Sequence, residues 1–198
     1  MLFTSLTHYI GSIFKANVAF PPLRPFIGGS VVAIAVFAFG STRYIGLGIP
    51  VIVEAFSEQL PGYDFALKIL FTAVTLGAAF KGGEVTPLFF IGATLGSALS
   101  YFFPLPTGLL AGMGFVAVFA GAANTPLACT IMAIELFGAS CGVYVALACV
   151  VAYFVSGHRG IYSAQQIGQP KHLIFSRHLG KRLSELKKDV RKRNQEKR

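Results

Sequence analysis

The sequence predicts an all-α, polytopic membrane protein made of short, tilted and broken helices, and three observations favour this fold class. Of the 198 residues, 54% are hydrophobic and 13% are charged, and this charged share is about half that of an ordinary globular protein. Gly and Pro interrupt most apolar segments before they reach the ~20 residues of a membrane-spanning helix. Of the 17 Lys and Arg residues, twelve lie from Arg159 onward, which is typical of a cytoplasmic tail under the positive-inside rule.

The net charge of +9 does not indicate a nucleic-acid-binding protein, because the basic excess follows the apolar segments on one tail. Cys129, Cys141 and Cys149 fall inside apolar segments, at spacings typical of neither a metal site nor a disulfide framework. We expect them to be small core residues, and we expect no metal, no cofactor and no nucleic-acid partner. An enzyme is disfavoured because no nucleophile–base pair or metal cluster falls on a common face.

The first part of the chain alternates between short helical segments and breaks. Residues 1–20 predict an amphipathic helix at the membrane interface, or the end of a preceding element. Prolines from Pro21 to Pro25 then break the chain, since a residue before proline avoids the helical region. An apolar helix is predicted from Phe26 to Phe39, and a shorter one from Pro50 to about Gln59.

The stretch from Tyr63 to Phe80 is the best candidate for a full-length span. It is apolar except for Asp64 and Lys68, which stand one helical turn apart and can pair on one face. We interpret them as a satisfied interfacial ion pair, and the alternative is a role in an ion path.

Small residues mark the next two helices. Gly92 and Gly96 lie at the spacing that lets membrane helices approach closely, within the apolar run from Leu88 to Phe103. The segment from Gly108 to Ala123 is poor in bulky side chains, so it needs neighbours on several sides. Further helices are predicted from Pro126 to Phe137 and from Cys141 to Val155.

The turn before Leu88 carries the clearest functional signal. Gly82 and Gly83 allow a sharp turn and a close approach of the backbone, Thr86 suits an N-cap, and Pro87 suits the first helical position. The free amides and dipole of such a helix start attract an anion, and Glu84 is the only charge in this turn. Because broken helices bind anions in transporters through their N-termini, the residues predict membrane anion transport.

These motifs resemble those of a known family. Gly82 to Pro87, with Gly92 and Gly96 after it, resembles the Gly-x-Phe-x-Pro motif of the CLC chloride channels and anion/proton antiporters. The stretch from Gly112 through Asn124-Thr125-Pro126-Leu127 to Glu135 is similar to the next two helices of that family. Tyr162-Ser163 resembles the start of its terminal helix, whose tyrosine hydroxyl helps to coordinate the central anion. The resemblance covers residues 22–162.

The family usually has an apolar residue and Phe where this chain has Glu84 and Val85. An acidic residue followed by Thr86 resembles the fluoride-exporting branch, which exchanges fluoride for protons. The resemblance thus implies anion-binding residues at Gly83, Glu84, Val85, Thr86 and Tyr162, with Glu84 also on the proton path. The alternative for Glu84 is a carboxylate that only stabilises the helix N-terminus.

Two family motifs are absent, namely a Gly-Ser-Gly-Ile-Pro-type loop and a Gly-Arg/Lys-Glu-Gly-Pro-type loop with the gating glutamate. Residues 46–50 resemble the first only superficially, because they precede the long apolar stretch. The resemblance therefore implies the second half of the CLC inverted-repeat fold, at residues 21–166. A basic cytoplasmic tail follows at residues 167–198, as a solvated helix or, alternatively, as a ligand for anionic lipid heads.

The function expected from this resemblance is that of the C-terminal half of a CLC-type fluoride/proton antiporter in the cell membrane, incomplete alone. The alternatives are a chloride channel or chloride/proton antiporter, a non-transporting membrane remnant, and one piece of a split transporter. The implied partners are fluoride or chloride, protons, membrane lipid and a second copy of the chain. The second copy would bind through the helices Pro126–Phe137 and Cys141–Val155.

Overall fold

The computed structural model describes residues 2–157, 160–162, 164–167, 171, 180, 182–183 and 185. Ser163 and most of the predicted tail helix lie outside these residues. In the described part of the chain, short α-helices follow one another with a single 3₁₀ turn among them. They are α1 Leu2–Asn17, α2 Leu23–Phe39, α3 Ile49–Ser57, α4 Asp64–Gly77, α5 Val85–Leu99, α6 Thr107–Ala123, α7 Pro126–Phe137, the 3₁₀ turn η1 Ala139–Cys141, and α8 Gly142–Val155.

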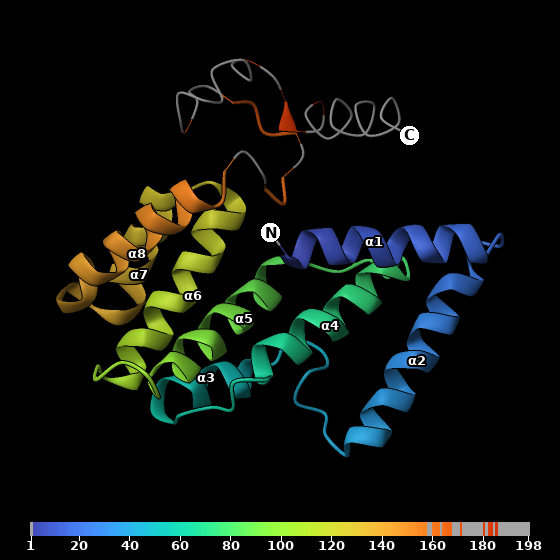
Figure 1. The fold of residues 1–198 in the computed structure, drawn as a ribbon, viewed down its shortest axis with the longest axis horizontal. Helices are drawn as coiled ribbons and strands as arrows, with labels where there is room; N and C mark the ends of the chain where they lie inside the picture. The colour runs from blue at the N-terminus through green and yellow to red at the C-terminus, as the bar shows by residue number, and fades with distance from the viewer. Residues whose placement is uncertain are drawn as a thin grey trace.

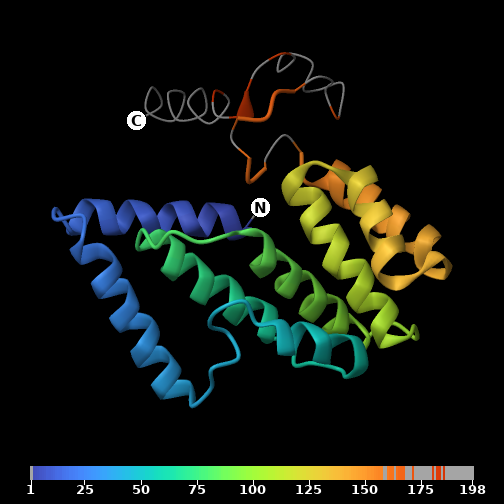
Figure 2. The same cartoon turned by 180° about the vertical axis from the view of Figure 1, so that it is seen from behind.

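Helices α4, α5 and α6 run through the middle of the molecule (Figure 1). The most extensive contact joins α5 to α6, followed by the contacts of α6 with α8 and of α1 with α4. The view from behind shows the same order, with α1 and α2 at one side and α7 and α8 at the other (Figure 2). The predicted all-α architecture of short helices is therefore confirmed for the residues that the structure describes.

Glycine contacts hold the centre of this arrangement together. A Cβ added to Gly92 of α5 would lie 2.3 Å from the carbonyl oxygen of Gly114, and one added to Gly96 would lie 2.1 Å from that of Leu110. Both partners belong to the backbone of α6, which cannot move aside as a flexible side chain can. The close packing predicted from the spacing of these glycines is confirmed.

The cysteines differ from one another in burial. Cys129 and Cys149 are 2% and 0% exposed in a hydrophobic cluster of α6, α7 and α8, as predicted. Cys141 is partly exposed, and its thiol donates to the Gly138 carbonyl oxygen at 3.0 Å. The prediction of a core residue is therefore wrong for Cys141, because the 3₁₀ turn before α8 brings it to the rim of the cluster.

Several helix bounds agree with the prediction and others differ. α7 begins and ends as predicted, and α6 begins one residue before Gly108. α2 begins at Leu23, before Pro25, because the first turn of a helix needs no N–H from proline. It ends at Phe39, and Gly40 caps it with a left-handed φ of 60°.

The predicted full-length span from Tyr63 to Phe80 is wrong. α4 has 14 residues and stops at Gly77, and Ala79 then takes a left-handed φ of 72°, which no continuing helix of L-residues adopts. Among the described residues, no helix has both the length and the apolar character needed to cross a membrane.

The predicted ion pair between Asp64 and Lys68 is replaced by contacts with the connection before α3. Asp64 pairs with Arg43 at 3.5 Å and accepts a hydrogen bond from the Tyr44 hydroxyl at 2.7 Å. The Lys68 ammonium donates to the carbonyl oxygens of Tyr44 and Gly46, at 3.1 and 2.8 Å. Both charged side chains are 1% exposed, because this connection folds over α4 and supplies the polar partners that buried charges require.

Candidate anion site at the start of α5

The site begins with the first turn of α5. Glu84 is the N-cap residue, and its carbonyl oxygen accepts the amide of Leu88 at 3.3 Å. The amides of Val85 and Thr86 have no intrahelical acceptor, because they belong to the first turn of the helix. The prediction of a start at Pro87 with Thr86 as N-cap is thus wrong by two residues. Proline is tolerated at any position of the first turn of a helix, so a Thr-Pro pair does not determine at which residue the helix begins.

The connection before this helix start takes its left-handed turn at Ala79. Neither Gly82 nor Gly83 has a positive φ, so neither takes the left-handed conformation for which glycine is needed, and the chain bends at Glu84 directly after them. A Cβ added to Gly83 would meet nothing within 4 Å. The space beside the helix start is therefore open on the side of Gly83.

The first turn of α5 lies at the border between solvent and the core. Glu84, Val85 and Thr86 are partly buried, whereas Pro87 and Leu88 are buried. Leu88 belongs to a hydrophobic cluster with Phe3 of α1 and Ile69 of α4. This cluster fixes the helix start and leaves the three preceding residues accessible.

Tyr162 comes from the far end of the chain. Its neighbour Ile161 donates its amide to the carbonyl oxygen of Ala122, at 2.9 Å, and packs against the cluster that contains Leu88. The segment of Tyr162 therefore reaches the cluster that also holds Leu88 of α5. The Tyr162 side chain is 50% exposed, and its contact with an anion stays a prediction.

The second Thr-Pro pair plays a different part. α7 begins at Pro126, but the Thr125 side chain does not cap it and lies 3.6 Å from the Cys129 sulfur. The residue before this pair, Asn124, has a left-handed φ of 60° and ends α6. Its side chain bonds to Gln165 and Lys171. The sequence interpretation missed these contacts, although Asn is a known left-handed helix terminator.

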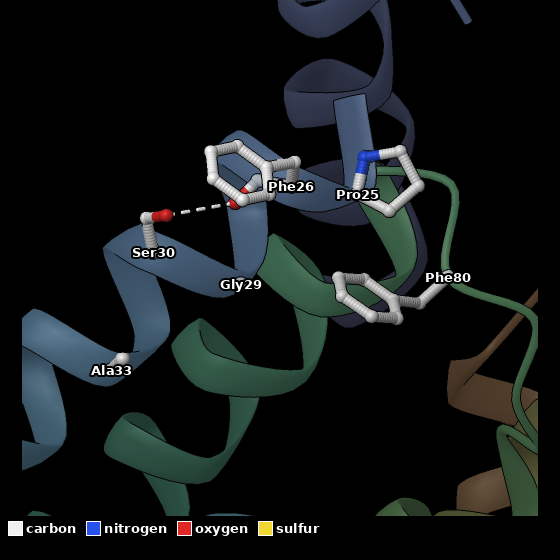
Figure 3. A pocket seen from close by; sticks show the side chains of 6 residues that line it. All are labelled: Pro25, Phe26, Gly29, Ser30, Ala33 and Phe80. Atoms are coloured by element: carbon white, nitrogen blue, oxygen red, sulfur yellow. Dashed lines mark hydrogen bonds between the residues drawn. The ribbon is translucent and has the colours of Figure 1, made fainter. Parts of the chain in front are cut away.

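An open apolar groove of about 540 Å³ lies near the connection before α5. Figure 3 shows Phe80 of this connection facing α2 across the groove. The one side-chain hydroxyl among its lining residues belongs to Ser30 and donates to the Phe26 carbonyl oxygen at 2.9 Å, so it is satisfied within the helix. A groove without a free hydrogen-bond donor does not suit a small anion. The residues that line it are Pro25, Phe26, Gly29, Ser30, Ala33 and Phe80.

Short helices joined by irregular connections, with a helix N-terminus that is open beside Gly83, are typical of membrane proteins of the broken-helix class. Within that class, the model of the voltage gated chloride channel family matches residues 1–157. The chain belongs to this family, so the resemblance drawn from the sequence motifs is confirmed.

Two relatives place the chain within the family. It is 54% identical over 178 residues to a chloride/fluoride channel protein of Pseudomonas syringae pv. tomato, a match that covers 87% of this chain and 39% of that one. The solved structure of a CLC-type fluoride/proton antiporter is similar with a TM-score of 0.76 and 35% identity. That match covers 81% of this chain and 41% of the antiporter. The chain thus spans about two fifths of the length of both relatives.

Proposed function

We propose that the chain acts in membrane anion transport, as the C-terminal half of a CLC-type fluoride/proton antiporter. The observation that carries the proposal is the start of α5, where Glu84, Val85 and Thr86 are partly buried beside the open space at Gly83. The fluoride named for both relatives supports the choice of ion.

An anion at this position would accept hydrogen bonds from the amides of Val85 and Thr86 and from the Thr86 hydroxyl. Fluoride is small and accepts hydrogen bonds strongly, so closely spaced donors favour it. The positive end of the helix dipole adds to the attraction. In this proposal, Tyr162 supplies a further hydroxyl from the segment that follows α8.

Glu84 would couple the anion to a proton. An ionised carboxylate at the same helix start competes with fluoride for the positive dipole and repels it, whereas a protonated carboxyl group is neutral and can donate a hydrogen bond. Binding of fluoride would therefore favour protonation of Glu84. This linkage would couple the two ions at one site, as a fluoride/proton antiporter requires.

The specific observation that favours a second candidate is the word chloride in the name of the Pseudomonas relative. A chloride channel or chloride/proton antiporter would use the same helix start. The larger chloride ion needs more room and gains less from a single hydroxyl donor, so selectivity separates the two functions.

The chain would lie in the cell membrane with its basic tail in the cytoplasm, in contact with lipid. A homodimer would form through the outer faces of α7 and α8. Leu127, Val143 and Leu147 on these helices are 77%, 80% and 64% exposed, which is a large apolar surface. In this proposal the chain carries out no covalent chemistry.

Fluoride efflux from liposomes tests the proposal. The chain spans about two fifths of the length of its relatives. Efflux is therefore measured for the chain alone and for the chain joined to the N-terminal part of the Pseudomonas relative. We expect the joined protein to release fluoride faster than chloride and to take up protons as fluoride leaves. Equal rates for both anions would contradict fluoride selectivity, and no efflux from the joined protein would contradict transport.

A further inference from the structure

Asn124 joins the end of α6 to the segments beyond α8. It caps α6 in a left-handed conformation, and its backbone N–H donates to the Ala120 carbonyl oxygen. Its side-chain Nδ2 donates to Gln165 Oε1 at 3.1 Å, and its Oδ1 accepts a hydrogen bond from the Lys171 ammonium. Both ends of one amide group are therefore used by residues 41 and 47 positions further along the chain. We call these three residues the Asn124 junction.

Lys171 extends the junction to the end of α8. Its ammonium donates to the Tyr153 carbonyl oxygen at 2.7 Å and to Ser156 Oγ at 2.9 Å, and it stands 3.8 Å from the centre of the Tyr153 ring. The last carbonyls of a helix carry partial negative charge and lack intrahelical donors. A cation placed there gains charge-assisted hydrogen bonds and a cation–π contact.

The segment that contains Tyr162 is bonded to the last residues of α6. Ile161 donates to Ala122 at 2.9 Å, and Gln165 Nε2 donates to the Ala123 carbonyl oxygen at 3.3 Å. The backbone amide of Gln165 also donates to the Tyr162 carbonyl oxygen, at 3.2 Å. Tyr162 thus lies between two anchored residues.

Gly160 allows the close approach that this segment needs. A Cβ added there would lie 2.7 Å from the Asn124 Nδ2 atom and 3.0 Å from the Ala122 carbonyl oxygen. The backbone just before Tyr162 therefore lies directly on the junction, and a displacement of Asn124 reaches Tyr162 through two residues of chain.

We propose that Asn124 and Lys171 are positioning residues, which hold Tyr162 against the end of α6 and so in place relative to the start of α5. The inference rests on the proposed function in one respect, namely that Tyr162 takes part in anion binding. It gives a lysine of the basic tail a specific task, in place of the solvated or lipid-bound state expected from the sequence.

Hydrogen exchange of the whole chain in detergent tests the mechanical part of the proposal. Lys171→Met removes the donors and the charge and keeps an apolar stem. We expect the Ile161 amide to exchange about tenfold faster in this variant, as for the loss of charge-assisted hydrogen bonds, while the amides of α4 stay unchanged. Lys15→Met, at an exposed lysine of α1, is the matched control. An unchanged Ile161 amide in Lys171→Met would overturn the proposal.

A double-mutant cycle keeps the test decisive if Lys171→Met folds poorly. Asn124→Gly removes the side chain and retains a residue that accepts the left-handed backbone. If both residues act through one junction, the double variant exchanges the Ile161 amide no more than about twofold faster than the more affected single variant. Effects that multiply would show independent contacts and contradict a single junction.

Fluoride binding to the same variants, followed by fluorine NMR, tests the positioning role. We expect the Kd of Lys171→Met to rise about tenfold, as for the loss of one placed donor, and that of Lys15→Met to match the parent chain. An Ile161 amide that loosens without a change in fluoride Kd would overturn the positioning role. If the parent chain binds no fluoride even when joined to the N-terminal part of the Pseudomonas relative, the proposed function fails, and the exchange data still decide whether the junction holds the segment.

Discussion

Gly92 of α5 and Gly114 of α6 lie with their backbones in direct contact. A Cβ on Gly92 would stand 2.3 Å from the Gly114 carbonyl oxygen, and a Cβ on Gly114 would stand 2.2 Å from that of Gly92. Neither helix can therefore carry a side chain at this crossing. Because the candidate anion site lies at the N-terminus of the same helix, two turns before Gly92, the contact with α6 also fixes the direction in which the site faces.

Gly92→Ala should destabilise the protein by about 3 kcal/mol, because overpacking against backbone forces the two helices apart. Gly62→Ala is the matched control, since a Cβ at Gly62 meets nothing within 4 Å. Thermal unfolding in detergent, followed by circular dichroism, measures both. Equal midpoints for the two variants would contradict the close approach of α5 and α6.

Tyr44→Phe should lower the free energy of unfolding by about 1.5–3 kcal/mol, the usual effect of losing a hydrogen bond to a buried charged group. The Tyr44 hydroxyl donates to Asp64, whose side chain is 1% exposed. Tyr63→Phe removes a hydroxyl from a side chain that is 60% exposed, so we expect no more than about 0.5 kcal/mol there. Comparable losses of unfolding free energy in both variants would contradict a stabilising role for the hydrogen bond between Tyr44 and Asp64.

Cys141 should react with a water-soluble maleimide at least about tenfold faster than Cys129 or Cys149, because reaction requires access to the thiol. Cys141 is partly exposed and the other two cysteines are buried. Mass spectrometry of the labelled protein measures the difference, and Cys141→Ser should abolish the fast phase. Fast labelling that persists in this variant would contradict the packing of α6, α7 and α8.

The Thr-Pro pairs show how far the sequence predicts the fold. At Pro126 the helix start is predicted correctly, because Asn124 ends the preceding helix in a left-handed conformation and leaves only one place to begin. At Pro87 no such terminator stands nearby, and the helix begins two residues earlier, at Val85. A proline limits a helix start to its first turn and does not choose a position within it.

The wrong predictions at the site and in the core concern contacts between residues that are far apart in the sequence. Lys68 is buried against carbonyl groups 24 and 22 positions away in sequence, so its spacing from Asp64 did not reveal its partners. Lys171 lies in a stretch whose composition indicates a solvated tail. Local spacing predicts helices and glycine contacts well, whereas the partners of buried charges depend on which connection folds over them.

Leu147→Trp should weaken self-association of the chain, because Leu147 is 64% exposed on α8 and would lie in the proposed homodimer interface. Phe37→Trp on α2, where Phe37 is 91% exposed, is the control for added bulk at another apolar surface. Energy transfer between labelled copies in liposomes measures the association. A larger loss in Phe37→Trp than in Leu147→Trp would move the interface to α2.

The most direct test of the anion site is fluoride binding to the chain with and without the Thr86 hydroxyl, followed by fluorine NMR. Thr86→Val keeps the shape of the side chain and removes one donor from the first turn of α5. Thr107→Val does the same at the first residue of α6 and is the matched control. The proposed site predicts that Thr86→Val raises the Kd for fluoride about tenfold and that Thr107→Val leaves it unchanged. Equal affinities in both variants would contradict an anion site at the start of α5.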